Sequence, residues 1–282
     1  MNSRSRRDFL TVAGVAAAAG LLPFPKVLAG HGSQKEQRPT VPFDLGVASY
    51  TFRAFTLDQT IDMMKRLGLK KLTLKDFHLP LTSPEADIKA ALGKIKNAGL
   101  ELASCGVVYM KTEEDVHGAF AYARAAGIKM MVGVPDPSLL ELTERKVKET
   151  DIALAIHNHG PTDQRFPSPE SAYKLIARMD RRMGLCIDVG HTQRLGLDPS
   201  VEAERFFDRL LDVHLKDVSS ADEKGGTVEI GRGVIDIPRL LKTLTRLNYA
   251  RVLHFEHEKD EKDPLPGLAE SVGYVRGVLA GI

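Results

Sequence analysis

Short apolar runs alternate with longer amphipathic segments along the chain from Val41 onward. The short runs have the length and composition of strands, and the longer segments repeat apolar residues at helical spacing. This alternation is typical of consecutive βα units that build a parallel sheet. Eight strands are predicted, at Leu45–Tyr50, Lys71–Lys75, Glu101–Val107, Lys129–Val134, Ile152–Asn158, Gly184–Asp188, Leu211–Leu215 and Arg251–Glu256.

Eight helices are predicted between and after these strands, at Leu57–Leu67, Pro84–Asn97, Glu113–Ala126, Ser138–Thr150, Pro169–Met179, Pro199–Arg209, Ile237–Leu247 and Pro266–Leu279. Gly68 and Gly99 are expected to end the first two, because glycine readily adopts the left-handed conformation after a helix. Ser83, Ser168 and Asp198 precede prolines and are expected to cap the helices that follow. Eight βα units in one chain predict a single (β/α)8 TIM barrel over residues 41–282, close to the typical size of about 250 residues.

Polar residues gather at the ends of the last four strands. Side chains alternate between the barrel interior and the surrounding helices, and the bulky aliphatic residues of these strands take the outward positions. His157, Asp188, His214 and Glu256 are therefore expected to point inward. Each lies near the C-terminal end of its strand, which is where TIM barrels carry their active sites.

Two imidazoles and two carboxylates in one cavity are costly to bury unless a positive charge joins them. A single histidine at such a position is more often a satisfied interior residue, but four polar residues on successive strands favour a shared cation. We therefore predict one divalent metal ion bound by His157, Asp188, His214 and Glu256. Mixed nitrogen and oxygen ligands suit manganese, zinc, cobalt or iron better than magnesium.

Five segments carry a resemblance to a known family. They are Ile156-His157-Asn158-His159, Cys186-Ile187-Asp188-Val189-Gly190-His191, Val213-His214-Leu215-Lys216-Asp217, Gly231-Arg232-Gly233-Val234-Ile235-Asp236 and Phe255-Glu256. In this order and spacing, the chain resembles the xylose isomerase-like TIM barrel superfamily, whose members are also described as sugar phosphate isomerases/epimerases. The resemblance implies Asp188, His214 and Glu256 as metal ligands. His157 stands where the family usually has a glutamate, so only one carboxylate remains of the pair that family epimerases use on opposite faces of the substrate.

Three residues are predicted to be catalytic. Glu256 is the expected base, His159 shares the inward face of His157 and is expected to carry protons, and Lys216 is expected to stabilise an enediolate oxygen. Alternatives remain open at two of these positions: His159 could instead hold another side chain in place, and Lys216 could pair with Asp188 or Asp217.

Four further residues are predicted to bind the substrate. The resemblance implies that His191 contacts sugar hydroxyls. Lys75 ends the second strand on the inward face and His78 follows it, while Arg232 lies in a Gly-Arg-Gly turn where the backbone can approach a ligand closely. The alternative for His191, Lys75 and His78 is a loop residue without a special role. His254 is expected to support Glu256.

Two functions remain in competition. The first is a metal-dependent sugar isomerase or epimerase that removes a proton next to a metal-bound carbonyl through an enediolate. The second is a lyase or hydratase of the same fold that catalyses β-elimination on 3-keto-glycosides or keto-sugars. The absent strand-five glutamate favours the second, because elimination needs only one strong base, and the family resemblance favours the first. An endonuclease IV-type enzyme and a non-enzymatic sugar-binding barrel are weaker alternatives.

Residues 1–29 resemble a twin-arginine signal peptide. Ser5-Arg6-Arg7-Asp8-Phe9-Leu10 is followed by an apolar run from Val12 to Leu22, which is short for a membrane anchor, and cleavage is expected near Ala29. Residues 30–40 are expected to form a flexible linker. The mature protein is therefore predicted to be periplasmic or otherwise extracytoplasmic, without stable membrane insertion. That location favours free sugars, keto-sugars or glycosides as substrates over sugar phosphates.

Charge and cysteine content narrow the choice of partners. The formal net charge is +2, and the leader contributes four of the basic residues against one acidic residue, which leaves −1 on the remainder. This balance gives no reason to expect nucleic-acid binding. Cys105 and Cys186 lie in different predicted strands and are expected to be buried thiols. A homodimer is compatible with the sequence, which does not decide the oligomeric state.

Overall fold

The structure, a computed structural model, describes residues 41–282. The predicted signal peptide at residues 1–29 and the linker at residues 30–40 lie outside the described residues. Within residues 41–282, no helix is both long enough and apolar enough to cross a membrane.

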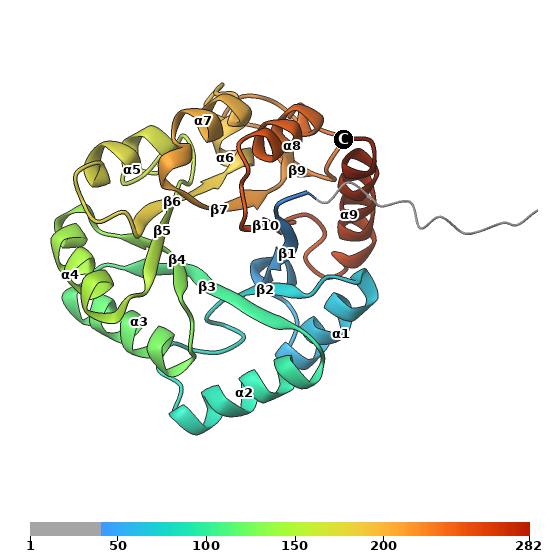
Figure 1. Cartoon of the computed structure of the whole chain (residues 1–282). Coiled ribbons are helices and arrows are strands. Elements are labelled where there is room, and N and C mark those ends of the chain that lie inside the picture. The colour runs from blue at the N-terminus through green and yellow to red at the C-terminus, as the bar shows by residue number, and fades with distance from the viewer. Residues whose placement is uncertain (1–40) are drawn as a thin grey trace, which may run out of the picture. The chain divides into compact units, whose positions relative to one another are not determined.

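Eight parallel strands close into a barrel in the order β1-β10-β7-β6-β5-β4-β3-β2. Figure 1 looks along this barrel and shows the strands enclosed by a ring of helices. The predicted (β/α)8 fold is therefore confirmed. The strands are β1 (Asp44–Ala48), β2 (Lys71–Leu74), β3 (Glu101–Met110), β4 (Met130–Pro135), β5 (Ala153–His157), β6 (Met183–Asp188), β7 (Leu210–Leu215) and β10 (Val252–Phe255).

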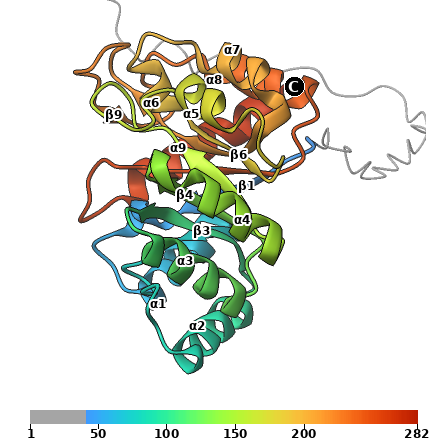
Figure 2. The same ribbon diagram turned by 90° about the vertical axis from the view of Figure 1, so that its left-hand side faces the viewer.

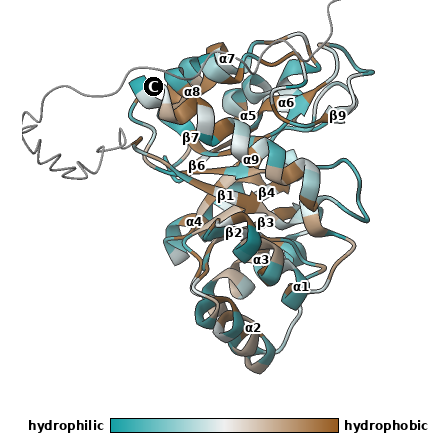
Figure 3. Cartoon of the chain, turned by 90° about the vertical axis from the view of Figure 1, so that its right-hand side faces the viewer, coloured by the Kyte–Doolittle hydropathy of each residue, from teal (hydrophilic) through white to brown (hydrophobic). Residues whose placement is uncertain are grey.

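The helices follow the strands in turn and pack around the outside of the barrel (Figure 2). Hydropathy follows the same layers, since the strands are mostly hydrophobic and the helices show hydrophilic positions on the outside (Figure 3). The α-helices are α1 (Leu57–Leu67), α2 (Glu85–Asn97), α3 (Glu113–Ala125), α4 (Leu140–Thr150), α5 (Pro169–Ile176), α6 (Val189–Gln193), α7 (Pro199–Arg205), α8 (Ile237–Arg246) and α9 (Leu265–Ala280). Three short 3-10 helices are η1 (Ser49–Phe52), η2 (Pro137–Leu139) and η3 (Phe207–Arg209).

Most predicted helix boundaries have the expected chemical cause. Gly68 ends α1 in the left-handed conformation, with φ 63°. The side chains of Ser168 and Asp198 cap α5 and α7 by accepting hydrogen bonds from backbone N–H groups of the first turn. The predicted cap at Ser83 is wrong, because α2 begins one residue later and Pro84, which has no side-chain acceptor, takes the capping position.

Two elements near the mouth of the barrel were not predicted. Helix α6 starts directly after Asp188, whose side chain caps it by accepting from the backbone N–H of His191. A short hairpin pairs β8 (Asp217–Val218) with β9 (Thr227–Val228). Elements of two to five residues are too short to carry a periodic pattern. They nevertheless set the positions of side chains around the mouth.

A buried arginine directly before β7 holds the segment between α5 and β6. Arg209 is 4% exposed, and its guanidinium donates to the carbonyl oxygens of Ala177, Met179, Asp180 and Met183 over 2.8–3.0 Å. These bonds satisfy carbonyl groups between the end of α5 and the start of β6. Arg209 therefore fixes the segment from which β6 carries Asp188 to the mouth.

Candidate metal centre and cavity

Four buried side chains meet at the C-terminal ends of the last strands. His157 ends β5, Asp188 ends β6, His214 lies in β7 and Glu256 directly follows β10. One donor atom from each lies within 4.8 Å of the other three. The structure thus brings together all four residues that the sequence analysis singled out as ligands.

The spacing of the donor atoms suits one ion. His157 Nε2 lies 3.2 Å from His214 Nδ1 and 3.5 Å from Asp188 Oδ2, and His214 Nδ1 lies 3.2 Å from Glu256 Oε2. Ligand atoms at about 2.1 Å from a common ion in tetrahedral geometry are about 3.4 Å apart. These three separations match those expected of atoms that share a cation, whereas His157 Nε2 and Glu256 Oε2 are farther apart, at 4.0 Å.

Asp188 is fully buried, and the ammonium of Lys216 lies 2.9 Å from its Oδ2. Its Oδ1 accepts from the backbone N–H of His191 over 2.7 Å, but its buried Oδ2 accepts no hydrogen bond from residues 41–282. The backbone N–H of Asp188 donates to the side chain of Asn158, which helps fix this strand end. Two imidazoles and two carboxylates whose donor atoms lie this close together fit a divalent cation.

Lys216 also contacts this cluster. Its side chain is 2% exposed, and Nζ lies 2.9 Å from Asp188 Oδ2 and 2.9 Å from Glu256 Oε2. Neither contact is aligned as a hydrogen bond, whereas Nζ does donate to Glu258 Oε1 over 3.0 Å. The ammonium compensates part of the negative charge of Asp188, Glu256 and Glu258. Of the two partners considered for Lys216, the structure shows Asp188.

Electrostatics keep the carboxylates ionised. Burial alone would raise the pKa of Glu256, but Lys216 and His214 hold that pKa well below its ordinary value. Burial would lower the pKa of Lys216, but Asp188 and Glu256 raise it well above its ordinary value, so this side chain stays an ammonium. Burial lowers the pKa of His157. A neutral imidazole keeps the lone pair that a metal requires. Burial would lower the pKa of His214, but Cys186 and Glu256 raise it well above its ordinary value, so this ring has to release a proton in order to bind an ion.

A cavity of about 140 Å³ opens above the cluster. Five residues predicted for the site line it: Lys75, His157, His159, His191 and Glu256. Four residues that were not assigned to the site also line it: Tyr50, Val107, Tyr109 and Glu258. Lys75 Nζ donates to the carbonyl oxygen of Val107 over 2.7 Å. The cavity thus combines a polar wall from the later strands with an aromatic wall from the earlier ones.

His159 lies within a chain of polar groups. Its Nε2 is 2.9 Å from the hydroxyl of Tyr109, and its Nδ1 is 3.3 Å from Asp163 Oδ2 without the alignment of a hydrogen bond. Burial, followed by the nearby His157, lowers the pKa of His159 to about 4. The ring is therefore neutral near pH 7 and can accept a proton from a group in the cavity or exchange one with Tyr109.

Two predicted substrate contacts are engaged elsewhere. His78 Nδ1 lies 2.9 Å from Ser49 Oγ, and its Nε2 lies 3.1 Å from Thr60 Oγ1, so both ring nitrogens hold the loop after β2. Arg232 pairs with both carboxylate oxygens of Glu270 on the surface. Neither residue lines the cavity. The Gly-Arg-Gly turn is instead held by Asp217, which accepts from the backbone N–H groups of residues 231, 233 and 235.

A second polar pair lies within the barrel near the cluster. His254 Nδ1 is 2.8 Å from Asp212 Oδ1, and both side chains are at most 1% exposed. His254 therefore pairs with Asp212 and not with Glu256, the partner expected for it. Cys186 could join His157 and His214 in an alternative donor set. Burial raises the pKa of Cys186 to about 12, so it is a neutral thiol and a poor ligand.

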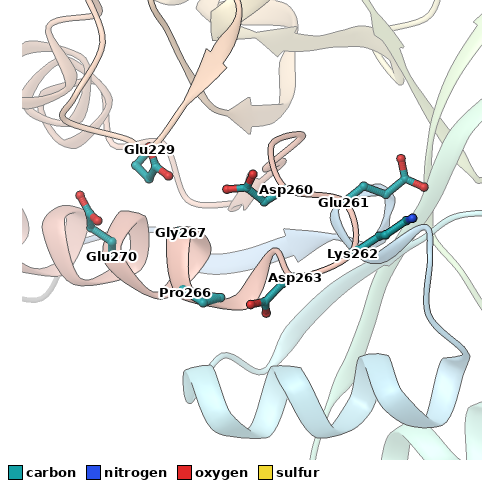
Figure 4. A pocket seen from close by; sticks show the side chains of 8 residues that line it. All are labelled: Glu229, Asp260, Glu261, Lys262, Asp263, Pro266, Gly267 and Glu270. Carbon is teal, nitrogen blue, oxygen red and sulfur yellow. The ribbon is translucent and has the colours of Figure 1, made fainter.

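A shallow acidic groove of about 740 Å³ lies outside the cavity, along the start of α9. Figure 4 shows Glu229, Asp260 and Glu270 around it. Glu229 pairs with Lys259 over 2.6 Å, and Glu270 pairs with Arg232. Because these carboxylates already have cationic partners, the groove offers no comparable concentration of unpaired charge.

Comparisons with known proteins agree with this architecture. A family model described as xylose isomerase-like TIM barrel matches residues 52–278. The rhizopine catabolism protein MocC of Rhizobium meliloti is 28% identical over 151 residues, which cover 48% of this chain and 46% of that protein. The match thus spans about half the length of this curated relative.

Two solved structures share the fold at low identity. The crystal structure of 3-keto-D-glucoside 4-epimerase, YcjR, from E. coli superposes with a TM-score of 0.70 at 14% identity and covers 83% of this chain and 99% of that chain. The crystal structure of IolI protein with a bound zinc atom gives a TM-score of 0.70 at 14% identity and covers 85% of this chain and 99% of that chain. At this identity the likeness establishes the fold.

Proposed function

We propose that this chain, which belongs to the xylose isomerase-like TIM barrel family, is a divalent-metal-dependent sugar isomerase or epimerase. It would act by removing a proton from the carbon next to a sugar carbonyl, through an enediolate. The observation that carries the proposal is the meeting of two histidines and two carboxylates, all buried and with donor atoms within 4.8 Å of one another, beneath a cavity. The zinc atom in IolI protein, which shares the fold, supports metal binding.

His157, Asp188, His214 and Glu256 would hold the ion. A divalent cation bound there supplies Lewis-acid polarisation of a carbonyl group. Manganese, zinc, cobalt or iron fit the mixed donor set better than magnesium. The ammonium of Lys216, buried beside both carboxylates, adds a fixed positive charge where an enediolate oxygen would develop negative charge.

Two groups at the cavity can move the proton. Glu256 is ionised and lines the cavity, so it can accept a proton from the substrate carbon, although its lowered pKa makes it a weak base. His159 is neutral and lies 2.9 Å from Tyr109, so the pair can return a proton to the neighbouring carbon or oxygen. Lys75 and His191 line the same cavity and are placed to contact substrate hydroxyls.

A carbon–oxygen lyase or hydratase is the second candidate. It is favoured by His157, which occupies the end of β5 where a second carboxylate base would be expected for a symmetrical epimerase. Elimination requires one base and one acid, and Glu256 with the Tyr109–His159 pair provides both. A keto-sugar or 3-keto-glycoside would then lose the substituent next to the enediolate.

The test is proton exchange with solvent. Metal-loaded protein, metal-stripped protein and the variant Asp188→Asn are incubated with free hexoses and 3-keto-glucosides in D2O and followed by NMR. We expect deuterium uptake beside the carbonyl with metal-loaded protein alone, because Asp188 is needed to hold the ion. Uptake without loss of a substituent indicates isomerisation or epimerisation, and release of the substituent indicates elimination.

A matched control is Glu202→Gln, which alters a carboxylate that is 5% exposed on α7 and outside the cluster. This variant should exchange at the wild-type rate. Exchange by metal-stripped protein at the rate of loaded protein, or equal exchange by Asp188→Asn, would contradict the proposed role of the metal.

We also propose that the protein acts outside the cytoplasm. The support is the twin-arginine motif Ser5-Arg6-Arg7-Asp8-Phe9-Leu10 and the apolar run after it. Replacing Arg6 and Arg7 with lysine should retain the protein in the cytoplasmic fraction. Unchanged fractionation of that variant would argue against this route.

A further inference from the structure

Aromatic side chains gather on one side of the mouth of the barrel. Tyr50 lies in η1 after β1, Phe77 in the loop after β2, and Tyr109 near the end of β3. Phe77 and Tyr109 are each 43% exposed, although aromatic rings of this size usually contribute most when buried. They face no other part of the described chain over much of their surface and are available to a ligand.

These rings contact one another or a neighbouring cationic side chain. The rings of Tyr50 and Phe77 have centroids 6.2 Å apart, within the range of interacting aromatic pairs. Arg53 lies 4.9 Å from the centroid of the Tyr50 ring, and Lys75 Nζ lies 5.6 Å from that of Tyr109. A cation on one face of each tyrosine restricts its orientation before a ligand arrives, which lowers the entropic cost of binding.

The cavity is too small for a large substrate. Its volume is about 140 Å³, and a protein cavity of about 150 Å³ holds one benzene molecule. The space above His157 and Glu256 therefore holds no more than one sugar ring. Any further ring of the substrate has to lie outside the cavity. Tyr50 and Tyr109 line the cavity, and Phe77 lies beside Tyr50.

We propose that Tyr50, Phe77 and Tyr109 form a subsite for a second six-membered ring, so that the substrate is a glycoside and not a free monosaccharide. The first ring would lie over the four-residue cluster, and the second, a sugar or an aryl group, would stack on the aromatic side chains. The apolar C–H face of a sugar ring and the face of an aryl ring both suit such a surface. The assignment of the first ring rests on the proposed function.

The experiment compares one-ring and two-ring probes on metal-loaded protein. The probes are methyl 3-keto-β-D-glucoside, phenyl 3-keto-β-D-glucoside and 3-keto-cellobiose, with kcat/KM measured by NMR. The wild type should favour at least one two-ring probe over the methyl glucoside by about 3- to 10-fold, the range that one aromatic contact supplies. Preference for the phenyl probe identifies an aryl group as the second ring, and preference for the disaccharide identifies a sugar. Equal kcat/KM for all three probes overturns the proposal.

Variants locate the effect. Phe77→Leu keeps an apolar side chain but removes the ring, and should abolish the two-ring preference while leaving the methyl glucoside within about 2-fold of wild type. The control Tyr274→Ala removes an aromatic side chain of similar exposure, 37%, on α9, and should change neither value. A loss of equal size on one-ring and two-ring probes in Phe77→Leu also overturns the proposal, because it would reflect a displaced loop.

A binding measurement separates this proposal from the proposed function. Phenyl and methyl β-D-glucosides lack the carbonyl, and their binding to metal-loaded protein is measured by calorimetry. Tighter binding of the phenyl compound, lost in Phe77→Leu, supports the subsite even if none of the keto-sugars reacts, in which case the proposed function alone fails. Turnover of the keto-sugars without any such difference in binding or kcat/KM leaves the proposed function standing and removes the subsite.

Discussion

Replacing Lys216 with methionine tests whether the ammonium and a metal ion share the same carboxylates. Lys216 is 2% exposed and lies 2.9 Å from one oxygen each of Asp188 and Glu256. Removing one partner from a buried charge cluster costs about 3–5 kcal/mol, since the remaining charges stay buried without compensation. At roughly 2–4 °C per kcal/mol for a domain of this size, the metal-free variant should unfold about 6–20 °C below the wild type.

Metal should reverse much of this loss. A divalent cation among the four donors would meet the same oxygens, Asp188 Oδ2 and Glu256 Oε2, that Lys216 contacts. Saturating metal at 100 times its Kd stabilises a protein by about 2.7 kcal/mol. In Lys216→Met the gain in free energy of unfolding should exceed the wild-type gain by at least about 2 kcal/mol, because the cation also removes the penalty of uncompensated charge.

The assay is urea unfolding of wild type and variant, each with chelator and with saturating Mn²⁺ or Zn²⁺. Lys94→Met serves as the control, since Lys94 forms an exposed pair with Asp58 and such pairs contribute about 0–1 kcal/mol. Equal stabilisation by metal in wild type and Lys216→Met would refute the reasoning. So would a metal-free Lys216→Met as stable as Lys94→Met.

Three further predictions follow from other contacts. His214→Ala should lower metal affinity at least 100-fold by calorimetry while Asp163→Asn leaves it unchanged, because His214 supplies one of the four donors and Asp163 supplies none. The pKa of His159 is lowered to about 4 from an ordinary value of 6.5, so between these pH values the unfolded chain binds more protons than the folded one, and the free energy of unfolding should fall as the pH falls from 6.5 towards 4. In urea titrations, His159→Gln should reduce this loss by at most about 3 kcal/mol. An unchanged dependence on pH in the variant would contradict the assignment. Arg209→Met should destabilise the barrel by about 3–5 kcal/mol in chemical unfolding, because four carbonyl groups lose a charged donor. The metal affinity of the folded protein should change little. A loss of stability below about 1 kcal/mol would show that these hydrogen bonds contribute less than their burial suggests.

The alternation of strand and helix patterns predicted the barrel because every βα unit repeats the same two periodicities. All eight predicted strands are present, with ends that differ by at most three residues. The four residues of the cluster followed from parity, since a strand end fixes which side chains face inward once the strand is placed. The prediction of this cluster did not depend on the conformation of any loop.

Residues on loops were harder to predict. His78 follows β2 in sequence, but Ser49 and Thr60 bind its two ring nitrogens, and contacts between separate βα units leave no mark in a single sequence. Glu258 was not assigned to the site, yet it accepts from Lys216 and lines the cavity. Tyr109 could have been found, because β3 extends to Met110 and places it near the end of the strand.

The histidine at the end of β5, where the family resemblance implies a glutamate, has consequences beyond the ligand count. A second glutamate would add another negative charge to a cavity that already holds Asp188 and Glu256 beside a single ammonium, Lys216. A neutral imidazole donates to a cation without that charge, so the cluster can be held with fewer compensating groups. His159 and the hydroxyl of Tyr109, which lie 2.9 Å apart, line the same cavity and carry no net charge near pH 7. Such an arrangement suits a reaction in which one side of the substrate gives up a proton to a carboxylate and the other side receives one from a neutral donor.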